Sequence, residues 1–142
     1  HAIKEYMHQG GKMLVSGAFI ASDMLSEEEQ DFTSSVLKYT YDTTMAPTSS
    51  ATSTLTGCGI NFTIPRTLNE KQYAVQTCDC LRPIDDKDCF ASFAYTENSR
   101  CAGIAYKNSG YRVMALGFPF ESVTSQRDRN TLMGAMLQFL LK

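Results

Sequence analysis

The chain has 142 residues, of which 43% are hydrophobic and 20% are charged, so it is long enough for one ordinary hydrophobic core and short for two. Its formal net charge is −2 and no Lys or Arg cluster stands out, which argues against a nucleic-acid partner. No apolar run approaches the roughly 20 residues that cross a bilayer, so we expect no membrane span. We predict one domain over 1–142, and because the chain does not begin with Met we expect a piece of a longer protein.

The first part of the chain predicts a helix, a buried strand and a second helix. Apolar residues at helical spacing followed by Gly10 and Gly11 predict a helix over 2–9. The nearly continuous apolar run over 12–20 is typical of a strand that is buried on both faces of a parallel sheet. Ser26 and Glu29 form a capping-box pattern, which predicts a helix that ends near Lys38.

The remainder of the chain predicts strands and one last helix. Residues 43–54 are rich in Ser and Thr, so we expect an exposed loop or a weakly paired edge strand there. Short extended runs predict strands over 55–64, 73–80, 89–95, 102–106 and 111–118. The turn signal at 108–110 makes the last two of them antiparallel neighbours. Ser125, with Asp128 three positions on, begins a helix whose apolar side is predicted to carry Leu132, Met133, Met136, Leu137, Leu140 and Leu141.

Taken together, these elements predict an α/β domain with a partly parallel, mixed sheet flanked by helices. Loops at the carboxyl ends of strands carry the chemistry of open α/β sheets, so the loop over 117–122 is the first place to look for a site. That loop offers one carboxylate, Glu121, and no histidine. Several tyrosines could line a sugar platform, although Tyr is also ordinary in strands; they are Tyr39, Tyr41, Tyr73, Tyr95, Tyr106 and Tyr111.

Five cysteines leave the redox compartment open. A polar loop separates Cys80 from Cys89, so a disulfide between them is one alternative and inert thiols are the other. The spacing of Cys78 and Cys80 is tighter than that of a usual zinc site, and the two histidines are distant in sequence. We therefore predict no metal site, and no motif indicates a cofactor. The remaining cysteines are Cys58 and Cys101.

Three stretches of the chain carry a resemblance to a known family. They are GKMLVSGAFIASDM over 11–24, GIAY over 103–106 and LGFPFESV over 116–123. In order and spacing they resemble the C-terminal region of large secreted proteins of Bacteroides-type bacteria that are named xanthan lyases. The resemblance implies a class I glutamine-amidotransferase-like, flavodoxin-like fold that lacks its N-terminal strands.

The same resemblance implies that amidotransferase chemistry is lost. The family places a nucleophilic Cys on the turn after a buried strand and a His and a Glu after the last strand. Here the first place holds Ser16 and Gly17, and the second keeps only Pro119 and Glu121. A hydroxyl such as that of Ser16 needs an adjacent base, and His8 lies on the preceding helix. Structural roles are favoured for both candidates: Ser16 at a tight strand exit, and Glu121 near the N-terminus of the last helix.

We therefore expect a non-catalytic ancillary or carbohydrate-interaction domain of a larger polysaccharide-processing protein. Two alternatives stay open: an active lyase or hydrolase with a site near Ser16 and Glu121, and a purely structural packing domain. The resemblance implies a secreted, periplasmic or cell-surface location in a bacterium. The expected partners are an acidic polysaccharide and other domains of the parent chain, and a homodimer through an exposed sheet edge is a further option.

Overall fold

The computed structural model describes residues 2–46, 49–55, 58–65, 67–69 and 73–142, with the backbone alone over 67–69 and 73–74. The helices are α1 (Ala2–His8), α2 (Glu27–Phe32), the π-helical turn η1 (Thr33–Leu37), the 3₁₀ turn η2 (Phe120–Ser122) and α3 (Gln126–Leu141). The strands are β1 (Lys12–Ser16), β2 (Tyr39–Met45), β3 (Ser50–Ser53), β4 (Asn61–Thr63), β5 (Thr67–Asn69), β6 (Tyr73–Ala74), β7 (Cys78–Pro83), β8 (Cys89–Tyr95), β9 (Cys101–Lys107) and β10 (Arg112–Leu116).

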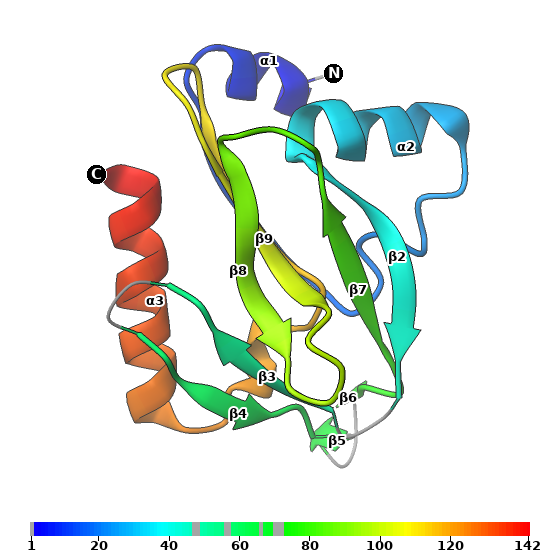
Figure 1. Cartoon of the computed structure of the whole chain (residues 1–142), viewed down its shortest axis with the longest axis vertical. Coiled ribbons are helices and arrows are strands. Elements are labelled where there is room, and N and C mark those ends of the chain that lie inside the picture. The colour runs from blue at the N-terminus through cyan, green and yellow to red at the C-terminus, as the bar shows by residue number, and fades with distance from the viewer. Residues whose placement is uncertain (1, 47–48, 56–57, 66, 70–72) are drawn as a thin grey trace.

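A six-stranded sheet in the order β1-β10-β9-β8-β3-β4 forms the centre of the molecule. Strand β1 pairs with β10 in parallel, and every other described ladder of this sheet is antiparallel. Strands β2 and β7 form a separate antiparallel ribbon, and β7 packs beside β9. The sheet and the ribbon together curl into a half-barrel, in which β8 and β9 lie between α3 and the β2–β7 ribbon (Figure 1).

The architecture contradicts the predicted flavodoxin-like fold, in which helices flank a mainly parallel sheet. Parallel neighbours need a long crossover connection, usually through a helix. Here short turns join β8 to β9 and β9 to β10, so these central strands have to be antiparallel. Among the described ladders, the predicted parallel pairing is found between β1 and β10, and fewer helices flank the sheet than a flavodoxin-like fold requires.

Two segments differ in the structure from what the sequence predicts. The apolar run over 12–20 forms a strand only as far as Ser16, and residues 17–25 form a loop. The segment over 43–54, which we expected to be a loop or a weakly paired edge, contains the end of β2 and all of β3, while 47 and 48 lie outside the described residues. Strand β3 pairs with both β4 and β8, so it is an internal strand.

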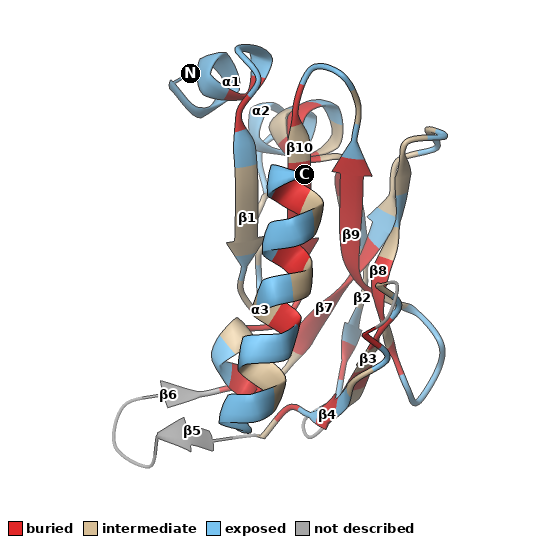
Figure 2. Ribbon diagram, turned by 90° about the vertical axis from the view of Figure 1, so that its left-hand side faces the viewer, coloured by how far each residue is buried: buried red, intermediate tan, exposed pale blue. Residues whose placement is uncertain are grey.

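Apolar side chains fill both faces of the sheet. One cluster includes Phe93, Phe118 and Leu132 and lies under α3, whereas a second cluster includes Met7, Tyr39 and Ile104 and lies toward α1, α2 and β2. Figure 2 shows that burial is densest along β9 and β10, which both clusters cover. Burial on two faces explains why these central strands are almost entirely apolar.

The helix signals of the sequence are confirmed. Ser26 and Glu29 form the capping box that begins α2, and Ser125 caps α3 by accepting a hydrogen bond from the Asp128 backbone N–H. The apolar side of α3 is narrower than predicted, since Leu137 and Leu141 are exposed.

Gly117 occupies a position that admits no side chain. A Cβ placed there would overlap the Asp79 carbonyl oxygen and would lie close to the Ala102 carbonyl oxygen. We expect Gly117→Ala to lower the free energy of unfolding by about 1–3 kcal/mol, measured by urea denaturation. Gly134, exposed in α3 with nothing near its Cβ position, is the matched control, and Gly134→Ala is expected to raise stability by about 0.5–1 kcal/mol. Equal effects at the two positions would contradict this interpretation.

Candidate functional site

A buried aspartate fixes the loop that follows β1. The side chain of Asp79, on β7, is 0% exposed, and its Oδ2 accepts hydrogen bonds from the backbone N–H groups of Ala21 at 3.0 Å and Ser22 at 2.8 Å. The Asp79 backbone N–H donates to the carbonyl oxygens of Ala18 and Gly117, each at 3.0 Å. One residue therefore joins the loop over 17–25 to the end of β10.

Two buried tyrosines add to this attachment of the loop at Asp79, which we call the anchor. The Tyr39 hydroxyl donates to the Ile20 carbonyl at 2.9 Å, and the Tyr95 hydroxyl donates to the Asp79 carbonyl at 2.8 Å. Because these bonds are shielded from water, each is costly to break without a replacement partner. The loop is thus held in one conformation by β2, β7 and β8.

Burial raises the pKa of the Asp79 carboxyl above its ordinary value, although the N–H groups of Ser22 and Ala21 act in the opposite direction. Its Oδ1 has no hydrogen-bond partner among the described residues. An uncompensated buried oxygen disfavours the charged form. The folded protein therefore holds the Asp79 proton more tightly than the unfolded chain does.

This difference makes stability depend on pH. A folded-state pKa above the unfolded value means that the stabilising contribution is complete below the unfolded pKa and is lost as the pH rises through the folded pKa. We expect wild type to lose stability relative to Asp79→Asn as the pH rises from about 4 upward, measured by urea denaturation at several pH values. Asp85→Asn, at an exposed carboxylate that is not among the groups acting on the pKa of Asp79, is the control. A difference between wild type and Asp79→Asn that does not vary with pH would contradict the assignment.

The anchored loop forms one wall of a small cleft. This cleft has a volume of about 280 Å³ and is lined by Ala21, Met24, Gln30, Thr33, Thr40 and Tyr41. These residues come from the loop after β1, from the α2–η1 helix and from the start of β2. The six side chains carry no formal charge, and they combine one aromatic ring with hydroxyl and amide groups.

The Tyr41 ring is presented at the surface. It is 44% exposed, and its hydroxyl hydrogen-bonds the Thr44 hydroxyl at 2.6 Å. The Gln30 side-chain amide donates to the Met24 carbonyl at 3.0 Å, which fixes the opposite wall. Of the other tyrosines proposed for a sugar platform, Tyr39, Tyr95, Tyr106 and Tyr111 are buried, and the side chain of Tyr73 lies outside the described residues.

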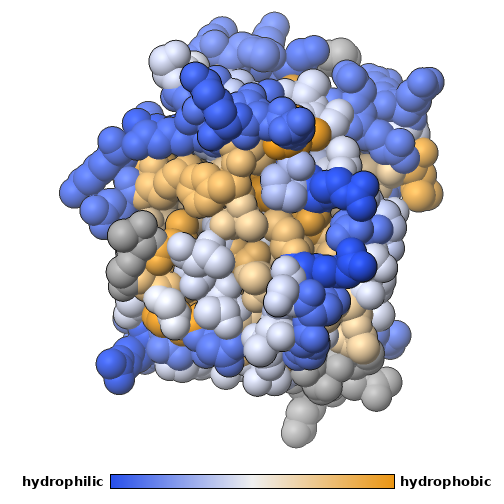
Figure 3. All heavy atoms as spheres, in the orientation of Figure 1, coloured by the Kyte–Doolittle hydropathy of each residue, from blue (hydrophilic) through white to orange (hydrophobic). Residues whose placement is uncertain are grey.

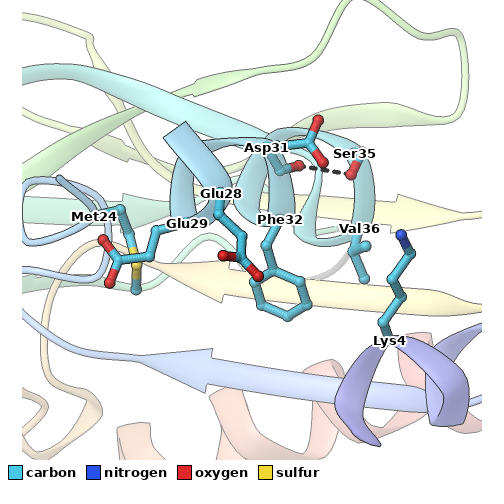
Figure 4. Close-up of a pocket in the computed structure, with 8 residues that line it drawn as sticks. All are labelled: Lys4, Met24, Glu28, Glu29, Asp31, Phe32, Ser35 and Val36. Atoms are coloured by element: carbon cyan, nitrogen blue, oxygen red, sulfur yellow. Dashed lines mark hydrogen bonds between the residues drawn. The ribbon is translucent and has the colours of Figure 1, made fainter. Parts of the chain in front are cut away.

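A second cavity, of about 250 Å³, is lined by residues of α1, of the loop after β1 and of the α2–η1 helix (Figure 4). Phe32 and Val36 form its apolar base, and its polar residues are mainly charged: Lys4, Glu28, Glu29 and Asp31. The Glu29 carboxylate also takes part in the capping box. Among the groups that lower its pKa, the Ser26 backbone N–H, which donates to it, has the largest effect. Met24 lines both cavities, so the loop over 17–25 shapes each of them.

The structure brings the two predicted site residues to the same end of the sheet. The Ser16 hydroxyl accepts a hydrogen bond from the Phe120 backbone N–H at 3.4 Å, next to Glu121. The His8 ring packs edge-on against Tyr111, with ring centres 6.0 Å apart, near the opposite end of β1, and His1 lies outside the described residues. The one described histidine therefore lies away from both candidates, and neither candidate lines the cleft beside Tyr41.

Glu121 lies four residues before the cap of the last helix. It is exposed in η2, whereas Ser125 caps α3. We therefore expect Glu121→Gln to change the free energy of unfolding by less than about 0.5 kcal/mol and Ser125→Ala to lower it by about 1 kcal/mol, both measured by thermal denaturation. A large loss of a polysaccharide-degrading activity in well-folded Glu121→Gln would instead assign this carboxylate a catalytic role.

All five cysteines are free thiols in the structure. Burial raises the pKa of Cys78 and of Cys101 to about 12 and that of Cys80 to about 11. Within the described part of the chain, no group of three His, Cys, Asp or Glu side chains is placed to hold a metal ion. Nor does any helix there combine the length and apolarity that crossing a membrane requires.

Comparison with known proteins identifies the fold and no family. No family model and no curated protein sequence matches the chain. Among solved structures, a β-galactosidase from Bacillus circulans sp. alkalophilus matches over 96% of this chain with a TM-score of 0.62 and 10% identity. An exo-β-1,4-mannosidase from Opitutaceae bacterium strain TAV5 matches over 98% with a TM-score of 0.56 and 13% identity. A cytoplasmic protein of Salmonella typhimurium LT2 matches over 97% with a TM-score of 0.60 and 10% identity.

The chain spans only part of each of these proteins: 20% of the β-galactosidase chain, 22% of the mannosidase chain and 59% of the Salmonella chain. At such low identity the likeness concerns the fold alone. The fold of this chain therefore recurs as one part of larger proteins.

Proposed function

We propose that the chain is a non-catalytic carbohydrate-interaction domain of a larger secreted protein that processes a polysaccharide. The observation that carries the proposal is the cleft beside Tyr41, whose lining combines one exposed ring with uncharged hydroxyl and amide side chains. Its setting in a secreted protein, similar to those named xanthan lyases, rests on the sequence resemblance.

The cleft has the chemistry that a sugar requires. One face of a sugar ring is formed by C–H groups that pack against an aromatic ring, and its edge carries hydroxyls that hydrogen-bond in both directions. Tyr41 supplies the ring, and the partly exposed Thr40 supplies a hydroxyl that can both donate and accept, whereas the Thr33 hydroxyl already donates to the Gln30 carbonyl. A fixed cleft also lowers the entropy lost on binding, and the anchor at Asp79 provides that rigidity.

The structural neighbours are compatible with this proposal. Two of them are named as glycosidases, a β-galactosidase and an exo-β-1,4-mannosidase, and this fold makes up about a fifth of each. A fold that accompanies such enzymes as a minor part suits an ancillary role. Ser16 and Glu121 remain the candidates for the alternative, a hydrolase or lyase, and the hydrogen bond from the Phe120 N–H to the Ser16 hydroxyl, next to Glu121, is compatible with it.

A combined binding and turnover screen tests the proposal. The purified chain is titrated calorimetrically with neutral and acidic oligosaccharides, including fragments of xanthan, while the ultraviolet absorbance of unsaturated uronates is followed. We expect heat of binding without growth of absorbance. Growth of absorbance would establish a lyase in place of a binding domain, and the absence of both signals would indicate a structural packing domain.

Variants locate the binding to the cleft. We expect Tyr41→Ala to weaken oligosaccharide binding about tenfold, because the stacking surface is lost, and Tyr41→Phe to retain most of the affinity. Tyr6→Ala is the matched control, since Tyr6 is 53% exposed but lies on α1, outside the cleft. Equal losses in Tyr41→Ala and Tyr6→Ala would exclude the cleft as the binding site.

A further inference from the structure

Two arginines that the sequence separates meet at one carboxylate. Asp42 Oδ1 accepts a hydrogen bond from Arg82 Nη2 at 3.0 Å, and Asp42 Oδ2 accepts one from Arg100 Nη1 at 2.9 Å. Asp42 lies on β2, Arg82 on β7, and Arg100 in the turn before β9. Arg100 lies 58 positions after Asp42 in the chain, so no local sequence pattern indicates that the two side chains meet.

Asp42, Arg82 and Arg100 form a charged cluster, and the backbone around each of these residues holds it in place. The β2–β7 register shifts between Tyr41 and Thr43, so Asp42 is the extra residue of a β-bulge, an irregularity that re-aims a side chain. The Arg100 backbone N–H donates to the Asn98 side-chain oxygen at 3.0 Å, and its carbonyl accepts from the Tyr95 N–H at 2.8 Å. Arg82 is fixed within the regular ladder of β7.

The cluster retains a net positive charge that faces solvent. Two guanidinium groups share one carboxylate, whose side chain is only 15% exposed, whereas the side chains of Arg82 and Arg100 are 66% and 49% exposed. A guanidinium carries five N–H donors in a planar fork that matches a carboxylate. Donors that Asp42 does not use are therefore available to a second, external carboxylate.

An apolar surface adjoins the charged groups. Strand β7, which carries Arg82, packs beside β9, and the first residue of β9, Cys101, directly follows Arg100. Cys101 pairs with Ala94 across the β8–β9 ladder, and both are partly exposed. Figure 3 shows an apolar surface over β8 and β9 that is bordered by hydrophilic side chains on the side of β7. A ligand that combines a carboxylate with an apolar ring face fits both features.

The cluster also adjoins the cleft described above. Thr40, which lines the cleft, stands directly opposite Arg82 in the β2–β7 register. Tyr41 of the cleft and Asp42 of the cluster are consecutive residues on β2. Directly opposite residues of an antiparallel pair project from the same face, so a chain of sugars that leaves the cleft past Thr40 reaches Arg82 and its partner Asp42.

We infer that Arg82 and Arg100 form a subsite for the carboxylate of a uronic acid, so that the cleft and the cluster together select an acidic polysaccharide. This inference rests on the proposed function and specifies the class of its ligand. Asp42 acts as the positioning residue that keeps the two guanidinium groups convergent while leaving one net positive charge.

The test compares oligogalacturonate with its fully methyl-esterified form, which has the same sugars without the charges. Calorimetry on wild type is expected to show about tenfold tighter binding of the acid and a preference that weakens at high salt. Arg82→Gln and Arg100→Gln should each weaken binding of the acid about fivefold and leave binding of the ester unchanged. Arg127→Gln, which removes an exposed arginine of α3, should change neither affinity.

The outcomes separate this inference from the proposed function. Equal binding of the acid and the ester by wild type would overturn the carboxylate subsite and leave the carbohydrate-interaction domain standing. Equal weakening of both ligands in the arginine variants would show that the cluster only supports the structure, and would also overturn the subsite. If wild type binds neither ligand nor any oligosaccharide of the wider screen, both proposals fail.

Discussion

The arrangement of the whole site depends on one buried residue at the crossing of the main sheet and the β2–β7 ribbon. The backbone N–H of Asp79 bonds both the loop after β1 and the end of β10, its carboxylate bonds the same loop again, and its carbonyl accepts the Tyr95 hydroxyl. Gly117 permits this close approach because it has no Cβ. The ribbon that carries Tyr41 and Asp42 and the loop that faces them are consequently fixed to the same point, and both parts of the proposed binding surface share one rigid frame.

Short-range signals in the sequence predicted local structure correctly. The capping box of Ser26 and Glu29, the turn over 108–110 and the cap at Ser125 each depend on residues within a few positions of one another. The end of β1 was not predictable in this way, because residues 18–22 are held out of the strand by Asp79, 57 and 58 residues further on. The fold class was wrong for a related reason: an apolar run shows that a strand is buried without showing whether its neighbours are parallel.

The candidate site was predictable only in part. Ser16 and Glu121 became candidates through the family resemblance, and the structure shows the Ser16 hydroxyl bonded to the Phe120 backbone N–H, next to Glu121. The sequence also offered Tyr41 among several tyrosines, but only the folded chain shows which ring stays exposed. The meeting of Arg82 and Arg100 depends on a β-bulge and on a turn in another hairpin, and no local pattern encodes that convergence.

The burial of the thiols bears on where such a domain can work. Disulfide formation and exchange proceed through the thiolate, and a thiol whose pKa is near 12, as for Cys78 and Cys101, supplies almost none of it at neutral pH. A low thiolate fraction slows the oxidation of Cys78 and Cys101 in the folded domain. These two thiols are thus compatible with an oxidising exterior as well as with a reducing interior, provided that the chain folds before they are oxidised.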